Sequence, residues 1–435
     1  MVTSCVTKEV IHKRAPSTTP PVAYYPSLPE RVMRQKRKGT QVKRKREEAV
    51  PTFSTWWQRL EEKEQVLRTE IEQFLETFSV LGTPLIHGSS VHFVYSNPEA
   101  RRVLLTGEFT QWDPQGVTMT RLGQTGIFYH TAKFHEPARI EYKFVVDGQW
   151  MADPLCPNVV DHGIGEQNSV FVVGDMQEPP ELAWIPTIPH GRAEKFHFES
   201  RLLCNQQHVS VYLPPDYDSD PHGLFPSLYV LDGSEYLTHA KLATVVDNLL
   251  HNRAIVPLIV VMVDPVDRVR EYQANEDYAQ AMEHELIPQI DRRYRTPAQR
   301  EARGVMGASL GGLMATYLAL SRPHLFSKVG GQSSALFLEQ EKLLALVEGL
   351  SPRLRFYFDV GAYEPQFNPT HTQLVPLLEA KGCPCFFQEL ASGHNWTSWR
   401  AHLKDLLSFL WKREGEEIAS GTPQNKPAGS RRRKR

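Results

Sequence analysis

The feature that most constrains the fold is a series of short apolar segments that alternate with helical patterns from about residue 195 onward. Helical patterns cover 238–252, 275–293, 311–321 and 369–381. Several of the intervening segments are apolar throughout, which is typical of strands covered on both faces. Residues 195–413 are therefore predicted to form an α/β domain with a mostly parallel sheet. The predicted strands are HVSVYLP, PSLYVLDG, PLIVVMVD, ARGVMGAS, FSKVGGQSS, RLRFYFDVG and PCFFQEL.

The preceding region, residues 86–175, has a different pattern. Its segments, such as SVHFVYSN and ARIEYKFVVDGQW, are short and rich in β-branched and aromatic residues. Turn pairs such as Asp147-Gly148 separate them at regular intervals, which predicts a small all-β sandwich. Residues 176–194 are rich in proline and are predicted to be a linker to the α/β domain.

The two ends of the chain are basic. Residues 31–46 carry nine basic side chains and no acid, and the last five residues are all basic, although the whole chain has a net charge of −1. Because no aromatic residues interleave with these charges, residues 1–52 and 414–435 are predicted to be solvated, disordered tails, and nucleic acid is not expected as a partner. Between the first tail and the sandwich, 53–85 has the apolar spacing of an amphipathic helix.

Composition also narrows the cell compartment. No segment has the roughly 18 consecutive apolar residues that span a bilayer, so no membrane partner is expected. The N-terminus lacks the apolar region of a secretory signal, and the five cysteines are odd in number and scattered, which favours reduced thiols in the cytoplasm. Cys383 and Cys385 have no second pair, so no metal site is expected there, and no cofactor is expected anywhere.

A serine between glycines marks the start of one helical segment. In GVMGASLGGL, residues 304–313, Gly307, Ser309 and Gly311 form the G-x-S-x-G pattern between an apolar strand and an apolar helix. In this context the pattern predicts a sharp turn that exposes the Ser309 hydroxyl as a nucleophile, since glycines allow the turn and the close packing of helix on sheet. The alternative is a helix start that is merely packed tightly on the sheet.

A nucleophilic serine needs a base and an acid, which follow it along the chain in this kind of fold. His394, in the loop of SGHNWTSWR after the last strand, is the predicted base, ahead of His324 and His371. For the acid, a loop carboxylate reaches the histidine more easily, so Glu364 is favoured over Asp359. A Ser–His dyad without a third member stays open. We expect Ser309 and His394 to lie within hydrogen-bonding distance at the carboxyl edge of the sheet.

The oxyanion of such a reaction needs backbone N–H groups. The first is that of Leu310, at the start of the helix. The second is predicted at Gly233–Ser234, where LYVLDGSEYL ends an earlier strand beside the nucleophile. The alternative is that Asp232-Gly233 is only a turn that ends the strand.

These motifs resemble the enterochelin esterase / esterase D group of α/β-hydrolases. The matching segments cover roughly residues 195–412, and they are LYVLDGSEY, REYQANEDY, ELIPQIDRRY, VMGASLGGLMATYLAL, DVGAYEP and SGHNWTSWR. The resemblance implies a serine carboxylic-ester hydrolase in which Ser309, Glu364 and His394 are nucleophile, acid and base. The chain has SGH where the family more usually has GGH before the histidine.

The N-terminal half carries a second resemblance. YKFVVDGQWMADPLCPN is similar to the N-terminal early-set immunoglobulin-like domain of cytoplasmic enterochelin esterases, and the stretch from VLLTGEFTQWD to IGEQNSVFVV resembles glycogen-binding modules. The latter resemblance implies a glycan platform of two stacking tryptophans, a lysine and an asparagine, namely Trp112, Lys143, Trp150 and Asn168. The alternative is that both tryptophans only pack at the rim of the sandwich.

Three functions follow from these observations. The first is a cytoplasmic enterochelin-type esterase that hydrolyses a catecholate siderophore and releases its iron, with Arg268 and Arg270 as candidate contacts for an anionic substrate. The second is an acetyl or feruloyl carbohydrate esterase with a glycan-binding module. The third is a non-catalytic α-glucan-binding protein, against which the Ser, Glu and His set argues. The sequence does not indicate an oligomeric state.

Overall fold

The computed structural model describes residues 82–134, 137–161, 167–351 and 353–413. All of them belong to one compact unit of the chain, Leu67–Arg435. The predicted disordered tails and most of the predicted helix at 53–85 lie outside the described residues. At the end of that predicted helix the structure has a strand, β1 (Leu85–His87).

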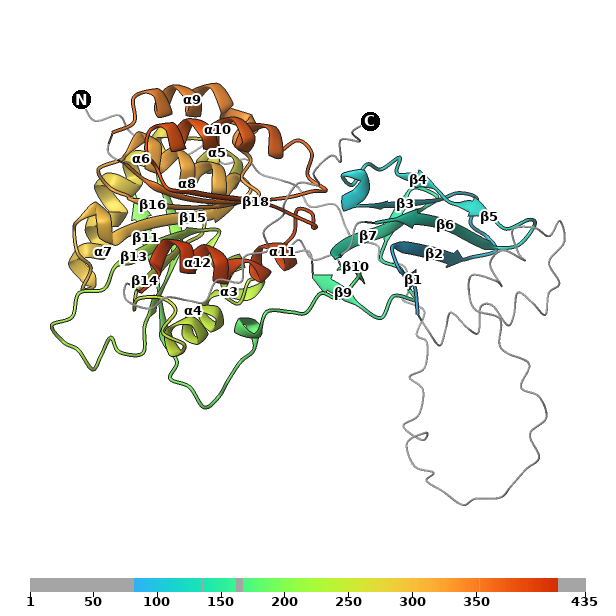
Figure 1. Cartoon of the computed structure of the whole chain (residues 1–435), viewed down its shortest axis with the longest axis horizontal. Coiled ribbons are helices and arrows are strands. Elements are labelled where there is room, and N and C mark those ends of the chain that lie inside the picture. Colours follow the sequence, from blue (N-terminus) through green and yellow to red (C-terminus); the bar gives the residue numbers. More distant parts are fainter. Residues whose placement is uncertain (1–81, 135–136, 162–166, 352, 414–435) are drawn as a thin grey trace, which may run out of the picture. The chain divides into compact units, whose positions relative to one another are not determined.

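The first region is a sandwich of two antiparallel sheets (Figure 1). One sheet has the order β1-β2-β6-β5, with β2 at Ser90–Ser96, β5 at Thr120–Arg121 and β6 at Ile127–Lys133. The other has the order β4-β3-β7-β10-β9, and β8 pairs with β7. Its strands are β3 (Val103–Gly107), β4 (Val117–Thr118), β7 (Ala138–Val146), β8 (Gln149–Met151), β9 (Val159–Asp161) and β10 (Gln167–Val173).

The strand β7 shows why this region folds as a sandwich. Alternate residues of a strand point to opposite faces. Tyr142 and Phe144 point into the aromatic core, where Phe93 meets Tyr142 edge to face at 5.0 Å between ring centroids. Glu141 and Lys143 therefore lie on the outer face of the same sheet. This alternation, visible in the sequence, separates a dry core from a polar outer face.

The second region is built on an eight-stranded sheet with the order β11-β12-β14-β13-β15-β16-β17-β18. From β14 to β18 neighbouring strands are parallel, and β11 and β12 are antiparallel. The strands are β11 (Arg192–Ser200), β12 (Asn205–Leu213), β13 (Ser227–Leu231), β14 (Ile259–Val263), β15 (Arg303–Ala308), β16 (Lys328–Gln332), β17 (Arg355–Gly361) and β18 (Cys385–Leu390).

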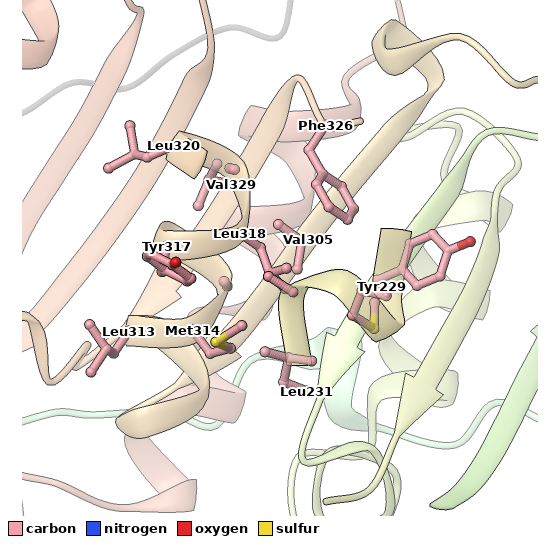
Figure 2. Close-up of a cluster of buried hydrophobic side chains, with 14 of the residues drawn as sticks. Tyr229, Leu231, Val305, Leu313, Met314, Tyr317, Leu318, Leu320, Phe326 and Val329 are labelled. Atoms are coloured by element: carbon pink, nitrogen blue, oxygen red, sulfur yellow. The ribbon is translucent and has the colours of Figure 1, made fainter. Parts of the chain in front are cut away.

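Helices cover both faces of this sheet (Figure 1). Leu228 and Val230 of β13 pack on the face covered by α4 (Leu242–His251) and α12 (Leu403–Trp411). Tyr229 and Leu231, the alternate residues, pack on the opposite face against α8 (Leu310–Ser321), as Figure 2 shows. Because both faces are covered, the central strands are apolar throughout, which confirms the predicted α/β fold.

The remaining helices fill in around the sheet. The predicted helix at 275–293 consists of α6 (Glu276–Ala281), a π-helical turn at Met282–Leu286 and α7 (Ile287–Arg293). The predicted helix at 369–381 corresponds to α10 (Asn368–Ala380). The sequence analysis did not predict edge strand β11 or the helices α3 (Gly233–Thr238), α5 (Arg268–Tyr272), α9 (Gln340–Glu348) and α11 (Trp396–Ala401).

Candidate active site

Ser309 lies at a sharp turn between β15 and α8, in the middle of the parallel part of the sheet. Its φ of 57° and ψ of −120° are strained for a residue with a side chain. The neighbouring glycines make the turn possible: a Cβ on Gly307 would lie 2.5 Å from the carbonyl carbon of Gly311, which is far inside van der Waals contact. The strand, turn and helix predicted around Ser309 are therefore present.

His394 is held in place by its own domain. Its Nδ1 hydrogen-bonds Oε1 of the buried Glu364, and because a carboxylate only accepts, Nδ1–H donates and leaves the Nε2 lone pair free to take a proton. The ring also packs against Phe367 and, edge to face, against Trp399, at 4.8 and 5.0 Å between ring centroids. The imidazole is thus fixed in both orientation and tautomer, as a general base requires.

Glu364 is itself fixed by two donors. Its Oε2 accepts a 2.7 Å hydrogen bond from Ser333 Oγ and a 2.5 Å bond from the Gly361 amide. Ser333 Oγ in turn accepts from Trp399 Nε1 at 3.0 Å. These donors fix the carboxylate in the orientation that presents Oε1 to His394.

Ser309 and His394 line one cavity of about 610 Å³. Within the described residues, the Ser309 hydroxyl makes no hydrogen bond to the imidazole, so the predicted contact is not formed in this structure. Nucleophile–base contacts are often loose in the absence of substrate and tighten when substrate binds. Both side chains border the same cavity, so a substrate bound there can contact both.

The predicted oxyanion donors differ in availability. The Leu310 amide is in the first turn of α8, where N–H groups have no acceptor within the helix. Gly233 begins α3 beside the same strand ends. The Ser234 amide, by contrast, donates to Asp264 Oδ1 at 2.6 Å. Ser234 is therefore engaged elsewhere, and the prediction reduces to Leu310 and Gly233.

Of the two arginines predicted to contact substrate, only one lines the cavity. Arg268 lines the cavity, but its Nε and Nη2 form a two-point contact with the Asp232 carboxylate, each at 2.8 Å. Arg268 thus braces the turn at the end of β13 as well as bordering the cavity. Arg270 is exposed, and it does not belong to the lining of the cavity.

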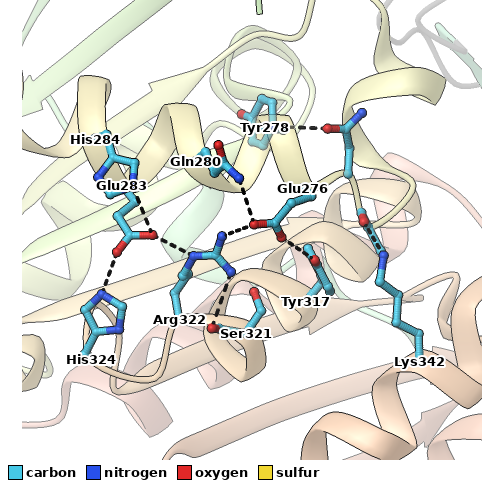
Figure 3. A network of polar contacts seen from close by, with 12 residues as sticks. Glu276, Tyr278, Gln280, Glu283, His284, Tyr317, Ser321, Arg322, His324 and Lys342 are labelled. Carbon is cyan, nitrogen blue, oxygen red and sulfur yellow. Dashed lines mark hydrogen bonds and ion pairs between the residues drawn. The ribbon is translucent and has the colours of Figure 1, made fainter. Parts of the chain in front are cut away.

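The other candidates for the acid and the base, Asp359, His371 and His324, do not line the cavity of Ser309. Asp359 is fully buried in β17, where Gln332 Nε2 donates to it at 3.3 Å and burial raises its pKa to about 6. His371 is buried under β18, stacked on Phe387, and burial lowers its pKa to about 4. His324 is on the surface, 2.8 Å from Glu283 in the network of Figure 3. Neither histidine lines the cavity of Ser309.

The four predicted glycan residues do not form one open platform. Trp150 is 40% exposed and Trp112 is half-buried, but Lys143 is only 4% exposed and Asn168 only 1%. Lys143 and Trp150 share the outer sheet face, since Trp150 pairs with Val145, two residues along β7 from Lys143. Asn168 Nδ2 donates to Glu141 Oε2 at 2.8 Å. Lys143 and Asn168 are therefore buried in this structure, and only the two tryptophans of the predicted platform have accessible surface.

Several cavity residues were not identified from the sequence. Arg139, Glu141, Val160 and Asp161 of the sandwich line the same cavity as Ser309, together with residues of the α/β domain. The latter include His239, Lys241, Trp396 and Arg400. Trp396 and Arg400 stand in the quoted motif SGHNWTSWR and could have been found there. The sandwich residues carry no local signal, because only the tertiary arrangement brings them to the cavity.

A half-buried serine on a strand–turn–helix, a carboxylate-bound histidine and a helix N-terminus on one parallel sheet form the arrangement expected of a serine hydrolase of the α/β type. Residues 200–410 match the Esterase family model, described as "Putative esterase", and residues 89–178 match the glycogen recognition site of AMP-activated protein kinase. The α/β region thus matches a family of esterases, which supports a carboxylic-ester hydrolase, and a region that matches a glycogen recognition site precedes it.

Individual relatives agree with this family. An iron(III) enterobactin esterase of Escherichia coli O6:H1 is 28% identical over 284 residues, which are 61% of this chain and 68% of the relative. An endo-1,4-beta-xylanase/feruloyl esterase of Xylanibacter ruminicola is 24% identical over 348 residues, 76% of this chain and 46% of the relative. The crystal structure of ferric enterobactin esterase from Salmonella typhimurium has a similar fold, with a TM-score of 0.66 at 20% identity, and covers 78% of this chain and 98% of that one.

No helix in the described ranges is both long enough and apolar enough to cross a bilayer.

Proposed function

We propose that the chain is a serine esterase of enterochelin-esterase type, which hydrolyses the ester bonds of a catecholate siderophore in the cytoplasm and so releases its iron. The observation that carries the catalytic part is the single cavity that holds Ser309 and the Glu364-bound His394. The relatives named as enterobactin esterases support the substrate class.

The reaction begins when Ser309 Oγ attacks the ester carbonyl carbon and His394 Nε2 takes the hydroxyl proton. The carbonyl oxygen becomes an oxyanion, which the amides of Leu310 and Gly233 stabilise. Collapse of this intermediate breaks the ester C–O bond; His394 returns the proton to the leaving alcohol, and the acyl group stays on Ser309. Water, deprotonated by His394, then attacks the acyl carbon; the bond to Ser309 Oγ breaks, His394 returns the proton to Ser309, and the acid is released.

The walls of the cavity support an aromatic and anionic substrate. Trp396 is stacked with His239, at 5.9 Å between ring centroids and 28° between planes, and both line the cavity. Arg139, Lys241 and Arg400 add positive charge to the same walls, in part balanced by the carboxylates that also line the cavity, Glu141, Asp161 and Glu235. Aromatic faces and cations of this kind suit catecholate rings and their negative charges.

A feruloyl or acetyl carbohydrate esterase is the second candidate. Two observations favour it: the match of residues 89–178 to a glycogen recognition site, and the presence of Glu141 and Asp161 of the sandwich in the cavity of Ser309. The relative named as a xylanase/feruloyl esterase belongs to the same comparison. In this reading Trp150 and Trp112 would stack on sugar rings.

The purified full chain should be assayed on three substrates: a ferric catecholate trilactone, a feruloylated oligosaccharide and an aryl acetate. Preference for the trilactone supports the first function, and preference for the feruloyl sugar supports the second. Absence of turnover on all three, together with retention on glycogen that is lost in Trp150→Ala, would support the third candidate, a non-catalytic glucan-binding protein.

A further inference from the structure

A carboxylate of the sandwich reaches the loop that carries the catalytic histidine. Glu108 follows β3 and is only 2% exposed. Its Oε1 accepts a hydrogen bond from Asn395 Nδ2, and its Oε2 accepts from the Glu141 amide at 3.0 Å. Asn395 is the residue directly after His394, so the sandwich and the base loop are joined one residue from the imidazole.

The same carboxylate also touches the residue before His394. A Cβ on Gly393 would collide with Cδ and Oε1 of Glu108. On the other side of the histidine, Asn395 Oδ1 accepts from the Ser398 amide at 2.7 Å and caps α11. The side-chain amide of Asn395 therefore links Glu108 to α11, the helix that begins just after His394.

The energetic cost of this arrangement argues for a positioning role. Burial and the nearby carboxylates of Glu141 and Glu364 raise the pKa of Glu108 well above its usual range. A buried carboxylate among other acids destabilises a fold unless its hydrogen bonds compensate. An apolar side chain would fill this site without that cost, but it could not accept the hydrogen bond of Asn395.

We propose that Glu108 is a positioning residue for the catalytic base: the β-sandwich completes the esterase site by holding the 393–395 loop, and with it His394, over Ser309. This inference rests on the proposed role of His394 as base. Glu108 is not part of the cavity lining, so it acts through the loop and makes no contact with substrate.

The test uses the full chain and an aryl acetate, which needs no knowledge of the natural substrate. Glu108→Ala should lower kcat about 10- to 100-fold, since misplacement of a catalytic group by about 1 Å costs that order of rate, and KM should change less than about twofold. The rate at which a fluorophosphonate labels Ser309 should fall in parallel, because it reports the activation of the nucleophile. Glu108→Gln, which keeps one carbonyl oxygen for Asn395, should recover most of the loss.

Asp153→Asn is the matched control. Asp153 is a second buried carboxylate of the sandwich, bonded to Tyr142 Oη at 2.7 Å, and it does not contact the base loop. It should lower the melting temperature but leave kcat within about twofold of wild type. Equal losses of kcat in Asp153→Asn and Glu108→Ala, or wild-type kcat and labelling in a folded Glu108→Ala, would overturn the proposal.

Two further variants keep the test decisive. Should Glu108→Ala not fold, Asn395→Leu removes the same hydrogen bond from the other side, and an unchanged kcat in that variant overturns the proposal. Ser309→Ala separates this inference from the proposed function. Turnover that survives in Ser309→Ala contradicts the catalytic serine itself, whereas a dead Ser309→Ala beside a fully active Glu108→Ala contradicts only the role of Glu108.

Discussion

Two buried glutamates, one from each region of the molecule, hold the same loop from two sides. Glu364 of the α/β domain bonds the imidazole of His394, and Glu108 of the sandwich bonds the side chain of Asn395. Each is only 2% exposed. They differ in what they touch: Glu364 acts on the ring that moves the proton, whereas Glu108 acts on the backbone segment that carries it. In the proposed mechanism the groups that move the proton all belong to the α/β domain, whereas contacts from both regions hold the loop that carries His394.

The largest effect should come from the nucleophile, which belongs to the α/β domain alone. Ser309→Ala removes the hydroxyl that forms the acyl-enzyme, so kcat should fall by at least about 10⁴-fold on an aryl acetate. The change keeps the Cβ and the backbone of the turn, and the melting temperature should stay within about 2 °C of wild type. Steady-state kinetics and thermal unfolding together check this result. Turnover near the wild-type rate would place the chemistry outside the proposed site.

The next effect separates the two acids near the end of β17. Glu364→Gln removes the charge that orients and stabilises the protonated His394, and kcat should fall about 10²- to 10⁴-fold. Asp359→Asn should leave kcat within about threefold of wild type, because Asp359 does not contact the imidazole. Kinetics on the two variants decides between them, and a larger loss in Asp359→Asn would reverse the assignment.

The Asp359→Asn variant also tests how stability depends on pH. Burial raises the folded-state pKa of Asp359 to about 6, so its ionisation opposes folding above that pH. Wild-type stability should therefore increase as pH falls from about 7 toward 5, as this carboxyl becomes protonated. Asp359→Asn should lack that increase and be more stable at pH 7, by on the order of 2 kcal/mol. Denaturant unfolding at several pH values measures both quantities.

The strand–turn–helix around Ser309 and the contact between Glu364 and His394 could be anticipated from the sequence, whereas the contact of Glu108 with the base loop could not. The turn at Ser309 needs glycines in fixed positions, and the order of nucleophile, acid and base follows from the order of strands in the sheet. Glu364 could be preferred to Asp359 because a loop side chain reaches further than one buried in a strand. Each of these signals is local or follows directly from the topology.

Other features depend on long-range contacts that leave no local pattern. Glu108 and Asn395 are 287 residues apart, so nothing in the segment around either residue indicates their contact. The burial of Lys143 and Asn168 cannot be read from their own segments either, because it depends on the tertiary arrangement and not on a local pattern. The sequence also could not exclude Ser234 from the oxyanion site. The amide of Ser234 donates to Asp264, 30 residues away, and nothing in its own segment indicates that contact.

A smaller effect tests the contact between the two regions directly. Gly393→Ala places a methyl group against the carboxylate of Glu108 and should lower kcat about tenfold and stability by about 1–3 kcal/mol. Combining it with Glu108→Ala removes the clash, so the double variant should lose less stability than the sum of the two single variants. A double-mutant cycle of melting and kcat measures this coupling. If the losses of stability in the two single variants simply add in the double variant, the methyl group at position 393 does not clash with Glu108.

The smallest effect should come from a brace inside the α/β domain, away from the base loop. Arg322, directly after α8, contacts Glu276 of α6 and Glu283 of the π-helical turn that follows α6, as Figure 3 shows. Because both carboxylates are partly solvated, Arg322→Gln should cost only about 1 kcal/mol and leave kcat unchanged. The hydrogen bonds of Arg322 and Tyr317 outweigh partial burial and lower the pKa of Glu276 to about 2.

The difference between Arg322→Gln and wild type should thus be full at neutral pH, begin to shrink as pH falls below about 4.5, and vanish near pH 2. A stability gap that persists at low pH would show that Arg322 acts by packing on α6 and not by charge. A fall in kcat without a change of KM would show that a contact at the far end of α8 also affects catalysis, as proposed for Glu108. Catalysis would then depend on contacts at two places, the base loop and the far end of α8.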